Sequence, residues 1–77
     1  MMAKQKYVLS EANGSRAAWA QRAIQAFESE TSCDREDSLC DLLCDLMHFA
    51  AQGQFDFDRE LSRAQGHFDV EKTGEEI

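Results

Sequence analysis

The stretch that decides the fold is DREDSLCDLLCDLMHFAAQ, residues 34–52. Its apolar residues recur at spacings of three and four, which is the periodicity of an amphipathic helix. Acidic residues crowd its first turn, where they complement the helix dipole, and Gly53 is the expected C′ residue after its end. The stretch therefore predicts a helix over 34–52 with an apolar arc wide enough to contact two neighbours. The arc consists of Leu39, Leu42, Leu43, Leu46, Met47, Phe49 and Ala50.

Two shorter helices are expected on either side of this one. The segment 15–30 is rich in alanine and has helical periodicity, and the Asn13-Gly14 pair predicts a turn that ends at Ser15 as N-cap. The segment 57–69 carries one apolar stripe, and Asp56 or Asp58 is its expected cap. The stripe consists of Phe57, Leu61, Ala64 and Phe68.

These three helices predict an all-α protein, a small three-helix bundle with a flexible N-terminal arm and a C-terminal tail. The expected organisation is an arm over 1–14, the bundle over 15–70 and an acidic tail over 71–77. Ten large apolar residues are expected to form the core: Trp19, Phe27, Leu39, Leu42, Leu43, Leu46, Phe49, Phe57, Leu61 and Phe68. The wide arc also makes a homodimer plausible.

Composition narrows the class of protein. The 77 residues hold 8 Lys+Arg, 15 Asp+Glu, 43% apolar residues and no proline, which is too apolar for a disordered acidic chain. A net charge of -7 argues against direct binding to nucleic acid or anionic lipid. The sequence shows no signal peptide and no apolar run of about 20 residues. Three cysteines do not make a disulfide scaffold, so a cytoplasmic location is expected.

The acidic residues are concentrated in one part of the chain. Residues 28–45 hold seven acids against Arg35, a net charge of -6. Asp37, Asp41 and Asp45 lie on one helix face, where successive carboxylates rise about 6 Å, against about 3.4 Å per phosphate of a DNA strand. The neighbouring acids would raise this density toward that of nucleic acid. The candidate partner-binding residues are Glu28, Glu30, Asp34, Glu36, Asp37, Asp41 and Asp45.

This acidic face has two interpretations. It is either an ordinary solvated surface or a site that binds a basic, nucleic-acid-binding surface of a partner and masks it, as a mimic of DNA. Masking is the leading hypothesis, and the first alternative is a homodimeric structural or regulatory module that assembles through its apolar arc. In that alternative the acids only keep the protein in solution.

Enzymatic chemistry finds little support. Clustered carboxylates in all-α pyrophosphohydrolases hold Mg²⁺, and the stretch EDSLCDLLCDLMHFA resembles that type, but the paired motifs of the MazG family are missing. Cys40, Cys44 and His48, with His67 from the next helix, have residue types that bind zinc, although free cysteines beside an apolar arc are usually structural. Cys33 lies among acids, which disfavours its thiolate. No cofactor, metal or catalytic residue is expected.

The second half of the chain resembles short acidic bacterial proteins of uncharacterised activity. They share a D-L-L-x-D-L-M-H pattern, then F-D-F-D and H-F, matched here by residues 41–48, 55–58 and 67–68. Such proteins are frequent in phage and mobile-element regions. The resemblance implies an anti-defence role, such as an anti-CRISPR or anti-restriction inhibitor.

Overall fold

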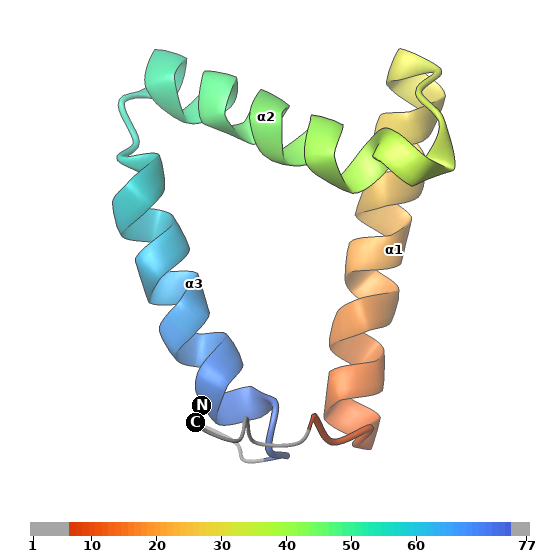
Figure 1. The fold of residues 1–77 in the computed structure, drawn as a ribbon, viewed down its shortest axis with the longest axis vertical. Helices are drawn as coiled ribbons and strands as arrows, with labels where there is room; N and C mark the ends of the chain where they lie inside the picture. Colours follow the sequence, from red (N-terminus) through yellow and green to blue (C-terminus); the bar gives the residue numbers. More distant parts are fainter. Residues whose placement is uncertain (1–6, 75–77) are drawn as a thin grey trace, which may run out of the picture.

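The computed structural model describes residues 7–74 and contains three helices, α1 (Glu11–Thr31), α2 (Arg35–Gly53) and α3 (Phe57–Glu71) (Figure 1). Residues 7–74 contain no strand. The all-α prediction is confirmed. In Figure 1 the helices form three sides of a frame, with α2 joining the far ends of α1 and α3.

Helix α1 begins four residues earlier than predicted. Its N-cap is Ser10, whose hydroxyl accepts a hydrogen bond from the backbone N–H of Asn13 at 3.1 Å. Asn13 and Gly14 therefore lie inside the helix, and the predicted turn with Ser15 as cap is wrong. The pair is a good turn sequence, but a capping serine three residues before Asn13 satisfies the free N–H groups of the first turn.

The predicted bounds of the other two helices differ from the structure by two residues or fewer. The C-cap of α2 is Gln54, which adopts a left-handed φ of 66°, whereas Gly53 stays within the helix. A Cβ at position 53 would lie 3.2 Å from the ring of Phe55, so this glycine permits the ring to approach the helix. Asp56 caps α3, accepting from the N–H of Arg59 at 3.1 Å, as one of the two predicted caps.

The start and end of the described chain are joined. The buried Asn13 amide donates to the carbonyl oxygens of Val8 at 2.9 Å and Glu71 at 2.8 Å. The N–H of Val8 donates to the Lys72 carbonyl at 2.7 Å, and the rings of Tyr7 and Phe68 stack at 6.2 Å. Residues 7–14 thus belong to the fold, which corrects the prediction of a flexible arm over 1–14. Residues 1–6 and 75–77 of the predicted arm and tail lie outside the described residues.

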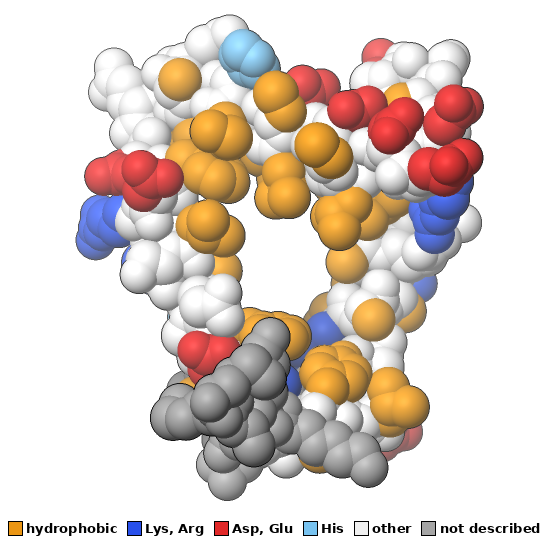
Figure 2. Space-filling view, viewed as in Figure 1, with side chains coloured by type: hydrophobic (Ala, Val, Ile, Leu, Met, Phe, Trp, Pro, Cys, Tyr) orange, Lys and Arg blue, Asp and Glu red, His pale blue; other side chains and the backbone are white. Residues whose placement is uncertain are grey.

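The frame is open. The radius of gyration is 14.5 Å, whereas a compact chain of this length has about 11.5 Å. The molecule measures 35 × 27 × 26 Å, so no long extension explains the difference. Figure 2 shows an opening between the helices that is bordered by hydrophobic side chains.

The predicted core does not form within one chain. Ala50 is the only buried hydrophobic residue among those that the structure describes. Seven of the ten predicted core residues are exposed, including Trp19 at 62%, Phe49 at 64% and Leu61 at 50%. Ordering each residue costs about 1 to 2 kcal/mol of conformational entropy. Burial within residues 7–74 offsets little of that cost, because the apolar faces of these helices are largely uncovered.

Candidate functional site

The corner between α1 and α2 is held by one arginine. The Arg35 guanidinium donates to the Glu28 carboxylate at 2.9 Å and to the Gln21 side-chain oxygen at 2.7 Å. Ser32 ends α1 with a left-handed φ of 60° and donates its N–H to the Glu28 carbonyl. These contacts fix the start of α2 against the end of α1.

The predicted partner-binding residues gather at this corner. Figure 2 shows acidic side chains grouped over the end of α1 and the adjoining half of α2. We call this surface the acidic corner; it consists of Glu28, Glu30, Asp34, Glu36, Asp37, Asp41 and Asp45. All of them except Glu28 are exposed. Within residues 7–74, Glu28 is the only one of the seven in an ion pair.

Glu28 differs from the rest of the acidic corner in its surroundings. The Arg35 guanidinium, and after it the Ser38 hydroxyl, lower the pKa of the Glu28 carboxyl below its ordinary value of 4.5. The negative charge of Glu28 is therefore already paired with Arg35 within the acidic corner. The other six carboxylates are free to meet a cation from outside.

A small hollow lies within the acidic corner. It has a volume of about 250 Å³ and is lined by Phe27, Thr31, Cys33, Asp41, Cys44 and Asp45. Apolar and thiol groups thus stand beside two carboxylates. Such a lining suits a lysine or arginine side chain, whose methylene stem packs on apolar surface while its charged head stays near solvent. The sequence analysis identified Asp41 and Asp45 but not Phe27 and Cys33 as neighbours. The reason is that the hollow is formed by residues of α1, of the connection after it and of α2.

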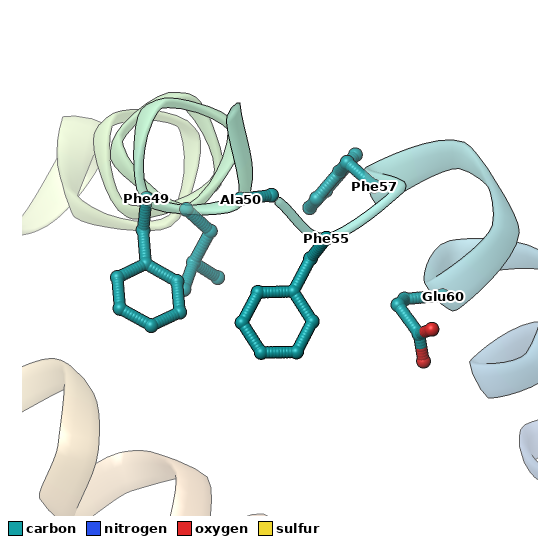
Figure 3. A pocket seen from close by; sticks show the side chains of 6 residues that line it. Phe49, Ala50, Phe55, Phe57 and Glu60 are labelled. Carbon is teal, nitrogen blue, oxygen red and sulfur yellow. The ribbon is translucent and has the colours of Figure 1, made fainter. Parts of the chain in front are cut away.

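The opposite side of α2 is apolar. A hollow of about 270 Å³ at the α2–α3 corner is lined by Leu46, Phe49, Ala50, Phe55, Phe57 and Glu60. The rings of Phe49 and Phe55 stack at 5.8 Å and point into the space between the helices (Figure 3). Leu61 follows Phe57 on the apolar stripe of α3. We call Leu46, Phe49, Ala50, Phe55, Phe57 and Leu61 the apolar lining.

A second apolar surface runs along α2. Its hollow of about 510 Å³ is lined by Glu36, Leu39, Cys40, Leu43, Cys44 and Met47, all of which belong to α2. No other described helix contributes to it. We call Leu39, Leu43 and Met47 the α2 stripe. Helix α2 thus presents apolar groups on adjacent faces, with Glu36 beside the α2 stripe, and carries Asp37, Asp41 and Asp45 on the remaining face.

The described residues offer little for metal or membrane chemistry. Within residues 7–74 no three His, Cys, Asp or Glu side chains are placed to hold a metal ion, so the structure does not bring Cys40, Cys44, His48 and His67 together as a site. Cys33, Cys40 and Cys44 are free thiols. None of the described helices combines the length and the hydrophobicity needed to cross a membrane.

No protein family model, curated protein or solved structure matches this chain.

Proposed function

We propose that the chain is a non-enzymatic interaction protein whose acidic corner docks on a basic surface of a partner protein. One observation carries the proposal: among six exposed carboxylates without a cation of their own within residues 7–74, Asp41 and Asp45 line a small hollow of mixed polarity. Charge complementarity speeds association and fixes orientation. The hollow supplies a specific contact that a merely solvated face lacks.

The hollow suggests how the contact forms. A partner's lysine or arginine would place its stem against Phe27 and its head beside Asp41 and Asp45. Arginine suits this arrangement best because its planar guanidinium pairs with carboxylates through two hydrogen bonds. The surrounding acids then steer the partner toward the hollow over about 10 Å at moderate salt.

We further propose that the partner surface is one that binds nucleic acid. The spacing of Asp37, Asp41 and Asp45 along α2 supports this, because the exposed neighbours Glu30, Asp34 and Glu36 would raise the density of a row that by itself is sparser than a phosphate chain. Docking would then exclude DNA or RNA from the partner. The resemblance to mobile-element proteins favours a host defence complex as the target.

Affinity capture from a bacterial lysate tests this proposal. The baits are the native chain, an Asp37/Asp41/Asp45→Asn variant and a control, Glu11→Gln/Asp58→Asn/Asp69→Asn, with the same change in charge outside the corner. We expect the native chain and the control to capture a nucleic-acid-binding protein. When that protein is purified in complex with the chain, added DNA should displace the chain. The corner variant should bind that protein at least about tenfold more weakly, and added salt should weaken native binding. Equal binding by all three baits would contradict the proposal.

A second candidate function, a self-associating structural module, is favoured by the exposed apolar lining. The two functions use neighbouring faces of α2, which meet at Glu36 and Cys44. One chain can therefore self-associate through its apolar faces and still present the acidic corner.

A further inference from the structure

Among residues 7–74, the exposed apolar surface is not part of a packed core, and it does not lie on a helix that could span a membrane. Phe49, Phe55 and Leu61 of the apolar lining are 64%, 54% and 50% exposed. Leu39 and Met47 of the α2 stripe are exposed to a similar degree. Monomeric proteins rarely leave contiguous apolar patches larger than a few hundred Å² uncovered, and larger ones mark interaction sites.

The excess exposed surface matches the area that a stable dimer buries. The chain exposes 6507 Å², whereas a compact monomer of its mass exposes about 4,700 Å². The excess is about 1,800 Å². It falls to about 700 Å² if residues 1–6 and 75–77 are assigned the area of a fully extended chain and are left out of the comparison. Two chains that each bury this excess share an interface of about 1,400 to 3,600 Å², which runs from the standard size of a stable complex into the range of obligate homodimers.

The charge distribution is compatible with a second copy. A chain with a net charge of -7 would repel its copy if the acids lay in the contact. Around α2, the mean direction of Asp37, Asp41 and Asp45 lies about 107° from that of Leu42, Leu46 and Phe49, so the two groups occupy neighbouring sectors that meet at Asp45 and Phe49. Of the residues that line the two apolar hollows, only Glu60 and Glu36 are acidic.

We infer that a second copy of this chain covers the apolar lining and the α2 stripe, so that the folded protein is a homodimer. Each copy offers the same surfaces, as a twofold interface requires. The two copies complete the core that one chain lacks, and folding is coupled to association. The dimer presents two acidic corners, one on each chain, and of the seven acids of the corner only Glu36 lines a hollow that the second copy covers.

Sedimentation equilibrium over about 1 to 100 µM chain tests the inference, because the apparent stability of a dimer depends on concentration. We expect the native chain to sediment with the mass of two chains and its thermal midpoint to rise with concentration. A folded species of one chain, with a midpoint independent of concentration, would overturn the inference. So would a species of more than two chains.

Three single substitutions locate the interface. Leu61→Glu and Leu43→Glu place a charge in the lining and the stripe, whereas Ser62→Glu adds the same charge to the outer face of α3. We expect the first two to raise the dimer dissociation constant at least about 100-fold, or to leave an unfolded monomer, since an unpaired buried charge is strongly unfavourable. Ser62→Glu should remain a dimer. A dimer retained by Leu61→Glu or Leu43→Glu would exclude that surface from the interface and overturn its assignment.

This test is separate from that of the acidic corner. The Asp37/Asp41/Asp45→Asn variant should keep the mass of two chains while it loses the basic partner. Loss of the dimer in Leu61→Glu with partner binding retained would leave the acidic corner as a site of the single chain.

Discussion

The two sides of α2 differ in what their exposure costs. The acidic corner meets water with charged groups that are already well solvated, so leaving it uncovered carries no penalty. The apolar lining meets water with aromatic and aliphatic groups, and each Å² that becomes covered contributes about 25 cal/mol. The comparison teaches that burial of the lining would drive the proposed assembly, whereas the acidic corner would select the proposed partner. In the proposed dimer the lining is covered throughout, whereas the acidic corner is covered only when the proposed partner binds.

The largest expected effect comes from removing a ring of the apolar lining. Phe49→Ala should reduce the free energy of unfolding by about 3 to 5 kcal/mol, because in the dimer the ring is buried and its loss leaves a cavity. If the ring stayed exposed, as it is in a single chain, the loss would be only about 0.5 kcal/mol. Urea denaturation at fixed chain concentration measures the difference.

His48→Ala is the matched control for this substitution. His48 is the next residue along α2, is exposed and lies on the side of Asp41 and Asp45. Removing its ring should change the free energy of unfolding by about 0.5 kcal/mol or less. Equal losses for the two variants would remove the distinction between the two sides of α2.

The sequence predicted the elements of this fold better than their packing. Periodicity located all three helices, and Asp56 was one of the two predicted caps of α3, because both signals are local. Ser10 was missed as the cap because the Asn13-Gly14 pair is also a good local turn sequence, and the bond from the Asn13 side chain to Glu71, 58 positions away, is one that no local pattern reveals. The apolar periodicity correctly marked residues that avoid water, but it does not say whether the same chain or another covers them.

For the candidate site, the sequence likewise predicted the local feature, a cluster of acids, but not the contacts between helices. The run of acids in 28–45 predicted an acidic surface, and Figure 2 shows acidic side chains grouped where α1 ends and α2 begins, although Glu36 lines the hollow of the α2 stripe. The hollow among them was not foreseen, because it needs Phe27 from α1 beside Cys44 and Asp45 from α2. Glu28 was grouped with its neighbours, although its pairing with Arg35 sets it apart.

A smaller effect is expected where the frame closes through polar contacts rather than apolar ones. Asn13→Ala removes the amide that bonds to the carbonyls of Val8 and Glu71 and leaves both without this donor. We expect a loss of about 1 to 3 kcal/mol in the free energy of unfolding. Gln25→Ala, at an exposed position of α1, should cost much less. If Asn13→Ala costs no more than this control, the closing contacts contribute little and the lining alone holds the frame.

The smallest effect lies inside the acidic corner. Because Arg35 lowers the pKa of Glu28 in the folded chain, the native state binds fewer protons at this group than the unfolded state does. The resulting stabilisation is present above the ordinary pKa of 4.5 and is lost as the pH falls through the lower folded value. Arg35→Gln should return the pKa of Glu28 toward its ordinary value, which NMR titration of its carboxyl carbon measures. Arg22→Gln removes the same charge from an exposed position of α1 and should leave that pKa in place. If the pKa of Glu28 changed equally in both variants, the overall charge of the chain, rather than the Arg35 contact, would be what lowers it.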